Sequence, residues 1–184
     1  MQTFFHVDKE SKLQPGQVIV PDESGLSLFG RRYSAQFRMA RMTFDAPYNS
    51  RTRNEITRRE YYLEATRRIF VSDDDTIHSR LSSFFCGEDL ETMTRIATRM
   101  KVRPGCPIFE VETESAVSRH DMTWLDFNFP VSLDKRLPYY QNYWHGRSID
   151  DLSTRPPGVP ASHSSLFEVL IPGEVRIGGI AGTT

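Results

Sequence analysis

One glutamate lies inside an apolar run near the C-terminal end of the chain. Glu168 follows Leu166 and Phe167 and precedes the sequence Val-Leu-Ile at residues 169–171. Burying a carboxylate is costly unless it has a polar partner or a chemical role. If the run is a strand, alternate residues face opposite ways, and Glu168 shares a face with Leu166 and Leu170. Two interpretations stay open, a functional carboxylate or a side chain on the solvent face of an edge strand, and the residues alone favour the second.

Arginine is concentrated between residues 31 and 68. This segment holds ten arginines and four acidic residues, a local charge of +6 in a chain whose formal net charge is −1. A guanidinium group binds phosphate through two parallel hydrogen bonds and stacks on bases, so the segment fits a nucleic-acid contact. Glu–Arg pairs along a solvated helix face explain it equally well. A sequence pI near 6.5 is atypical of a dedicated nucleic-acid-binding domain.

The motifs of several enzyme classes are missing from the sequence. It contains no Gly-x-x-x-x-Gly-Lys phosphate loop and no Gly-x-Ser-x-Gly elbow. The five histidines are scattered and no Cys-x-x-Cys pair occurs, so we expect no metal site. The acidic run at residues 73–75 fits a solvated turn or a helix cap better than a cation site.

The hydrophobic pattern indicates an α+β fold. Apolar residues recur three or four apart over residues 54–70 and 88–101, which predicts two helices. Alternating or continuous short apolar runs predict strands at residues 3–7, 17–20, 107–113 and 166–171, with a continuation at 175–177. The form of the tyrosine-rich segment at 137–146 stays open. Helices come first and strands predominate later, which favours α+β over a doubly wound parallel sheet.

Length and composition fit one globular domain. The chain has 184 residues, of which 38% are hydrophobic and 26% charged. We predict a single domain over residues 1–184, with an arginine-rich helical segment at 31–70 and a flexible tail at 178–184. No apolar run is long enough to cross a bilayer and no export signal is seen, so we expect a cytoplasmic protein with reduced cysteines and no membrane partner.

Three separated pieces of the chain, taken together, resemble the ADP-ribosyltransferase superfamily. Residues 4–7 (Phe-Phe-His-Val), followed by Leu13 and Gly16, look like that fold's opening strand and its "Leu-x-x-Gly" turn. Residues 78–85 (His-Ser-Arg-Leu-Ser-Ser-Phe-Phe) are similar to the "Ser-Arg-x-Ser-x-x-Phe" segment of toxin-like and DNA-targeting members. Residues 167–175 look like the late strand that carries the catalytic glutamate in the form "Glu-Val-Leu-Val-Pro". The resemblance implies a core of two packed, mostly antiparallel sheets with flanking helices.

The resemblance also implies NAD as the substrate that donates ADP-ribose. Glu168 is then the catalytic carboxylate, which stabilises positive charge on the sugar as nicotinamide leaves. His6 would bind the adenosine ribose, and Arg80 the pyrophosphate. Ser79 and Ser82 would line the nicotinamide site.

Each of these residues also has a structural interpretation. A half-buried strand histidine would account for His6, a surface salt bridge for Arg80, and local turn hydrogen bonds for Ser79 and Ser82. Tyr143 belongs to an aromatic cluster with residues 139, 140 and 144, which could stack on nicotinamide or on a target base. Core packing is the more frequent use of such a cluster.

One departure from the family pattern bears on the acceptor. Members that modify arginine carry a second Glu or Gln two residues before the catalytic one, and here that residue is Leu166. The resemblance therefore favours DNA or RNA over protein arginine as the acceptor, with nucleic-acid contacts at Arg51, Arg53, Arg58 and Arg59. It implies a toxin or defence effector, with a protein antitoxin as a further partner. The alternative is a non-catalytic nucleic-acid-binding or protein-interaction module that uses the 31–68 face.

Overall fold

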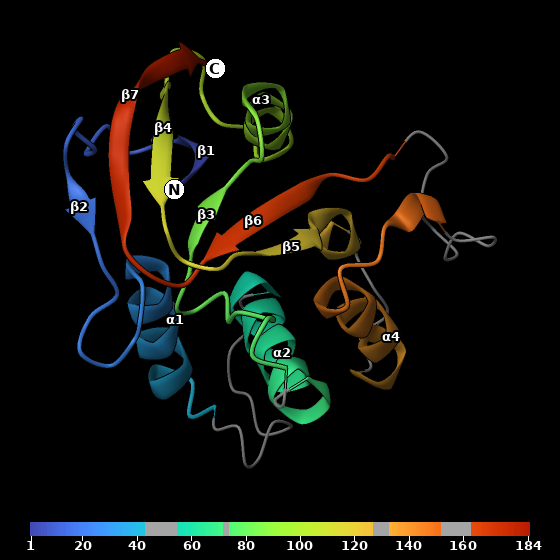
Figure 1. Ribbon diagram of the computed structural model, residues 1–184. Helices are drawn as coiled ribbons and strands as arrows, with labels where there is room; N and C mark the ends of the chain where they lie inside the picture. Colours follow the sequence, from blue (N-terminus) through green and yellow to red (C-terminus); the bar gives the residue numbers. More distant parts are fainter. Residues whose placement is uncertain (43–54, 72–73, 127–132, 152–162) are drawn as a thin grey trace.

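The computed structural model describes residues 1–42, 55–71, 74–126, 133–151 and 163–184. Within these ranges the chain forms four α-helices and two antiparallel sheets, which confirms the expected α+β fold (Figure 1). The described part contains no helix that is both long and apolar enough to cross a membrane.

The larger sheet has the strand order β1-β4-β7-β2, and all its pairings are antiparallel. Its strands are β1 (Gln2–Val7), β2 (Val18–Ile19), β4 (Pro107–Thr113) and β7 (Val175–Thr183). Val111 lies opposite Phe4 on one side and Ile177 on the other. These three side chains are buried together in one hydrophobic cluster, so the alternating pattern of β4 directs its apolar face into the core.

The smaller sheet has the order β3-β6-β5, with β6 in the centre. Its strands are β3 (Phe84–Cys86), β5 (Ser118–Asp121) and β6 (Phe167–Ile171). Paired backbone hydrogen bonds between Phe5 and Gly87, of 3.0 and 2.8 Å, join its β3 edge to β1 of the larger sheet. Val169 and Ile171 pack into the same hydrophobic cluster as Val111. One face of β6 therefore covers the larger sheet and the other is left for the helices.

Three helices lie along that other face, and a fourth lies on the opposite side of the smaller sheet (Figure 1). The three are α1 (Leu28–Met39), α2 (Glu55–Phe70) and α4 (Leu133–Trp144). The fourth, α3 (Leu90–Arg99), packs against β1 through Met93, Ile96 and Ala97. Both helices expected at 54–70 and 88–101 are confirmed, because their apolar residues recur at helical spacing.

The arginine-rich segment 31–70 contains most of α1 and all of α2, and its residues 43–54 lie outside the described part. Ser27 caps α1 by accepting a hydrogen bond from the backbone N–H of Gly30 at 3.1 Å. Gly30 lies against the backbone of Leu81, where a side-chain carbon would meet the Leu81 carbonyl oxygen at 1.8 Å. A glycine at this position lets α1 approach the segment that leads into β3.

The tyrosine-rich segment is helical and buried. Tyr140, Tyr143 and Trp144 of α4 are each no more than 1% exposed and pack against Leu63 of α2 and Leu170 of β6. These three side chains are therefore part of the hydrophobic core.

The prediction of a flexible tail at 178–184 is wrong. β7 continues to Thr183, with Gly182 opposite Ile108 and Thr183 opposite Pro107. The backbone N–H of Thr184 donates to the carbonyl of Cys106 at 3.0 Å. Glycine-rich sequence resembles a frayed end, but here the small residues let strands approach closely, since a side-chain carbon on Gly178 would lie 3.0 Å from that of Glu110.

Candidate active site

Glu168 lies on the central strand of the smaller sheet and points toward the helices. Its neighbours Val169 and Ile171 face the larger sheet, whereas Leu170 packs with α2 and α4. Because strand residues alternate, Glu168 shares the helix-facing side with Leu170. Only 6% of its surface is exposed. The interpretation of Glu168 as a solvent-facing residue of an edge strand is therefore wrong.

Two groups hold the same oxygen of this carboxylate. Nη1 of Arg80 forms an ion pair with Oε1 of Glu168, and the Tyr143 hydroxyl donates to Oε1 at 2.7 Å. Nη1 of Arg80 also donates to the Tyr143 hydroxyl oxygen at 2.9 Å, which closes a three-membered network. No hydrogen bond from the described part of the chain reaches Oε2. Glu168 is thus fixed through one oxygen, and its other oxygen accepts no hydrogen bond from the described residues.

Arg80 is buried between two carboxylates. Its Nε donates to Oε2 of Glu60 on α2 at 2.9 Å, and its guanidinium lies over the rings of Phe85 (4.7 Å) and Phe29 (5.7 Å). Burial alone would lower the pKa of Arg80, but the adjacent carboxylates of Glu168 and Glu60 outweigh it and raise that pKa well above its ordinary value. Arg80 therefore stays charged and keeps both carboxylates in place.

Glu60 extends this network to the surface. Burial would raise its pKa, but the charges of Arg80 and Arg59 outweigh burial, and the pKa of Glu60 is lowered. Arg59 binds Glu60 at 2.8 Å and also donates to the carbonyl of Leu125 at 3.3 Å. The side chains of Glu168, Arg80, Glu60 and Arg59 contact one another in that order. Their charges alternate in sign and sum to zero, so the buried charges compensate one another.

His120 supports the network from β5, directly opposite Glu168 in the strand register. Its ring stacks on Tyr143 at 4.8 Å, and Nδ1 lies 2.8 Å from the Tyr143 carbonyl oxygen. Nε2 lies 2.9 Å from the Ser118 hydroxyl. Burial and the Arg80 charge lower the pKa of His120 to about 4. The imidazole is therefore neutral near pH 7, donating through Nδ1 and accepting at Nε2.

The hydroxyl of Tyr143 stays protonated. Burial, together with the negative charge of Glu168, raises the pKa of Tyr143 well above its ordinary value. A phenol with a raised pKa remains a hydrogen-bond donor, so it holds Oε1 of the carboxylate across the neutral pH range.

The predicted serines lie near this network but do not contact Glu168. Ser79 donates from its hydroxyl to Glu64 at 2.7 Å and accepts from the backbone N–H of Leu81 at 3.1 Å. The Ser82 hydroxyl donates to the carbonyl of Ser79 at 3.0 Å. Both therefore make the local hydrogen bonds that were the structural interpretation of these serines. Glu64 is in turn paired with Arg67 and Arg68, as expected from Glu–Arg pairing along α2.

His6 lies on the other side of β3 from Glu168. Its ring packs against Phe84 at 4.4 Å, and its Nδ1 lies 2.7 Å from the carbonyl oxygen of Phe85. Arg80, however, lies over the ring of Phe85. Consecutive strand residues point to opposite faces, so the two rings separate His6 from the Arg80–Glu168 pair. Burial lowers the pKa of His6.

The predicted nucleic-acid contacts are only partly described. Arg51 and Arg53 lie outside the described residues. Arg59 forms an ion pair with Glu60, and Arg58 is half-buried and also interacts with another group. Five described arginines of this segment are exposed. Arg31 is paired with Asp22 and Arg68 with Glu64. The other three are Arg32, Arg38 and Arg41, on α1 and just after it. The described part of the chain forms no ion pair with these three.

Sequence reasoning missed Glu60 and His120. Glu60 lies on α2, and a glutamate on a helix is normally expected at the surface. β5 has the polar sequence Ser-Arg-His-Asp, which does not predict a strand. Comparisons with protein-family models and with curated proteins found no significant match.

Proposed function

We propose that this protein transfers ADP-ribose from NAD to a macromolecular acceptor, with Glu168 as the catalytic carboxylate. The observation that carries the proposal is the arrangement around Glu168. Arg80 and Tyr143 fix one carboxylate oxygen, and no group of the described chain occupies the other. A carboxylate held in this way, in a largely water-excluded setting, is prepared for a cationic partner.

The chemistry needs such a group. When the bond between nicotinamide and ribose breaks, nicotinamide leaves with the bonding electrons and positive charge develops on the sugar. A negative oxygen near the ribose stabilises that charge and lowers the barrier, as in glycoside hydrolysis. An oxygen or nitrogen of the acceptor then forms the new bond to the anomeric carbon and gives up its proton.

Arg80 has a different role in this proposal from the pyrophosphate contact implied by the resemblance. Its guanidinium is shared by Glu168, Glu60 and Tyr143, and the residue is only 8% exposed, which favours positioning of Glu168 over binding of two phosphates. The proposal rests on Glu168, Arg80 and Tyr143, since His6 lies across β3 from them.

The test is incubation with NAD labelled in its adenylate part and separate pools of DNA, RNA and protein. We expect wild type to label one pool and Glu168→Gln to label none. Glu174→Gln removes the same charge from an exposed residue six positions further along the chain and serves as the matched control. Transfer that survives in Glu168→Gln, or no transfer and no nicotinamide release by wild type, would contradict the proposal.

The acceptor that we propose is a nucleic acid. Leu166 takes the place of the acidic or amide residue expected for arginine modification, and it is 3% exposed and packed with Val7 and Met93. Arg32, Arg38 and Arg41 are exposed and form no ion pair within the described part of the chain, so they supply positive charge for phosphates.

The same surface supports a second candidate function, a nucleic-acid-binding module without transferase activity. Binding of labelled oligonucleotides should weaken steeply as salt rises and should be lowered by Arg38→Gln. Salt-dependent binding combined with no NAD cleavage would favour the second function. If folded wild-type protein neither cleaves NAD nor binds oligonucleotides, both candidate functions are contradicted.

A further inference from the structure

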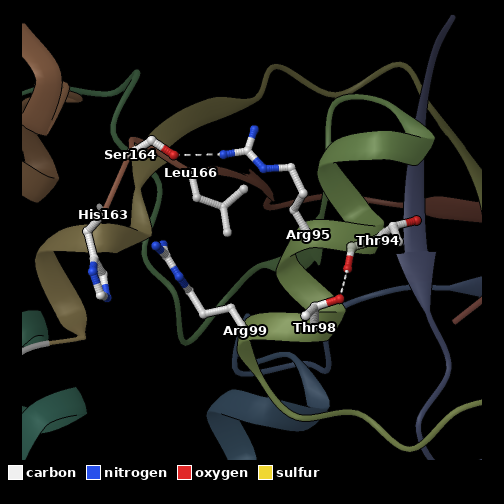
Figure 2. A pocket seen from close by; sticks show the side chains of 7 residues that line it. All are labelled: Thr94, Arg95, Thr98, Arg99, His163, Ser164 and Leu166. Atoms are coloured by element: carbon white, nitrogen blue, oxygen red, sulfur yellow. Dashed lines mark hydrogen bonds between the residues drawn. The ribbon is translucent and has the colours of Figure 1, made fainter. Parts of the chain in front are cut away.

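A hollow outside the Glu168 network lies between α3 and the segment that leads into β6. Its volume is about 420 Å³, and it is open to solvent. Figure 2 shows two arginines of α3 extending into it, with Leu166 between them and His163 on the far side. The described residues that line it are Thr94, Arg95, Thr98, Arg99, His163, Ser164 and Leu166.

Arg95 is held in position by neutral groups. Its Nη2 donates to the Ser164 hydroxyl at 3.1 Å and to the Ser165 carbonyl at 3.2 Å (Figure 2). Within the described ranges Arg95 forms no ion pair, although it is an exposed residue. Its Nε and Nη1 keep their hydrogens for another acceptor. Arg95 is thus an oriented cation whose charge no carboxylate of the described chain neutralises.

Arg99 lies one helical turn further along α3, on the same face. Its Nη1 donates to the Thr123 hydroxyl at 2.9 Å, and its Nε binds Asp126 at 3.0 Å. These two contacts fix the second guanidinium, while its Nη2 donates to no acceptor in the described part of the chain. Residues four apart on a helix are neighbours, so both guanidinium groups can reach one ligand.

A third donor lies beside Arg95. The Ser164 hydroxyl oxygen already accepts from Arg95, which leaves its own hydrogen free to be donated. The donors are therefore two oriented guanidinium groups and one hydroxyl, with the apolar Leu166 between them. The hollow offers positive charge and several N–H groups around one open space.

We propose that this hollow binds a phosphate group. Phosphate has several acceptor oxygens, so one phosphate can accept from both guanidinium groups and from the Ser164 hydroxyl at the same time. Asp126 pairs with only one of the two arginines, so a net positive charge remains to attract an anion. This site goes beyond the proposed transferase function and needs neither Glu168 nor NAD. The phosphate comes either from a nucleotide or from a nucleic-acid backbone.

The test follows the Nε–H signals of Arg95 and Arg99 by NMR as phosphate is added, with chloride keeping the ionic strength constant. Three probes are titrated separately: inorganic phosphate, adenosine monophosphate, and a short oligothymidylate without terminal phosphates. We expect saturable shifts at both arginines. Saturation by the monophosphates identifies a nucleotide-type ligand, and saturation by the oligothymidylate identifies a nucleic-acid backbone.

Two variants give the comparison. Arg95→Gln removes one of the two guanidinium groups and should weaken binding by about tenfold, which is the effect of losing one charge-assisted contact. Arg99 reports binding in that variant. Arg103→Gln removes the same charge from an exposed residue just beyond α3 and should bind as wild type does. Shifts that fail to saturate with every probe, or equal affinity in Arg95→Gln and wild type, would overturn the proposal.

Discussion

The hydroxyl oxygen of Tyr143 lies 2.7 Å from Oε1 of Glu168, although the two residues are 25 positions apart in the chain. The same hydroxyl accepts from Arg80, so one phenol connects both members of a buried ion pair. The contact joins α4 to the central strand of the smaller sheet. Packing of the helices and geometry of the proposed site therefore depend on the same few atoms.

Replacing Tyr143 with Phe tests how much this connection stabilises the fold. The variant keeps the ring but removes a buried hydrogen bond to a charged oxygen, so we expect the free energy of unfolding to fall by about 1–3 kcal/mol. Urea unfolding followed by circular dichroism measures the change. Tyr62→Phe is the control, because Tyr62 packs beside the same core and its hydroxyl has no hydrogen bond within the described part. An equally small change in both variants would contradict the prediction.

Replacing Arg80 with Gln leaves two buried carboxylates, Glu60 and Glu168, without their shared cation. We expect the free energy of unfolding to fall by about 3–5 kcal/mol at neutral pH. Arg119→Gln removes an exposed partner of Glu88 and should cost at most about 1 kcal/mol.

The cost of Arg80→Gln should depend on pH with a definite sign. In wild type the pKa of Glu60 is lowered in the folded state, so its contribution is present above the unfolded pKa of 4.5 and is lost as pH falls further. Without Arg80, burial acts on Glu60 with less opposing charge and raises its folded pKa, so folding then favours proton uptake. The difference between variant and wild type should therefore shrink from neutral pH toward about pH 5. A difference that grows on acidification would contradict this account.

His120 should contribute to acid destabilisation of the wild-type protein. Its pKa is lowered from 6.5 to about 4 in the folded state, so the unfolded chain binds the proton more readily. Stability is then lost as pH falls from 6.5 toward 4, by on the order of 3 kcal/mol. His120→Gln keeps one donor and one acceptor and should flatten the unfolding free energy over this interval. His145→Gln, at an exposed position, should leave the profile unchanged.

The sequence correctly predicted the helices and strands in which the local spacing of apolar residues matches the face that is buried in the fold. α2 and α3 repeat their apolar residues at helical spacing, β4 alternates with a period of two, and β1 and β6 contain short apolar runs. β5 and the end of β7 lack that agreement. β5 is made of polar residues, and it pairs with β6. β7 contains glycines, which allow close contact with β4. Strands of this kind form because of the strands they pair with, and the local spacing of apolar residues does not reveal which strands those are.

The same limit applies to the site. A glutamate inside an apolar strand indicated correctly that Glu168 needs a polar partner. The identity of that partner, 88 residues away in the case of Arg80, depends on how the helices pack. Carboxylates on helices usually face solvent, so the sequence did not single out Glu60, which is 2% exposed in the fold and bonded to Arg80. The apolar neighbours of Glu168 indicate a buried charge, but the residue of opposite charge that pairs with it depends on the tertiary fold.

Gly30 offers a test in which local propensity and tertiary packing predict opposite signs. In an exposed helix interior, replacing glycine with alanine stabilises by about 1 kcal/mol. Here the added carbon would lie 1.8 Å from the carbonyl oxygen of Leu81, a backbone atom that also accepts from Ser27. α1 must then move away from Leu81, and with it Phe29, whose ring packs against Phe85 and lies near Arg80.

We therefore expect Gly30→Ala to lower the free energy of unfolding by about 1–3 kcal/mol, the usual cost of overpacking. Urea unfolding measures this effect. Gly179→Ala is the matched control, because Gly179 is exposed, has open space around it and has no left-handed backbone. It should change stability by no more than about 0.5 kcal/mol. If Gly30→Ala stabilised the protein instead, helix propensity would outweigh the contact with Leu81, and α1 would not be held against the residue that follows Arg80.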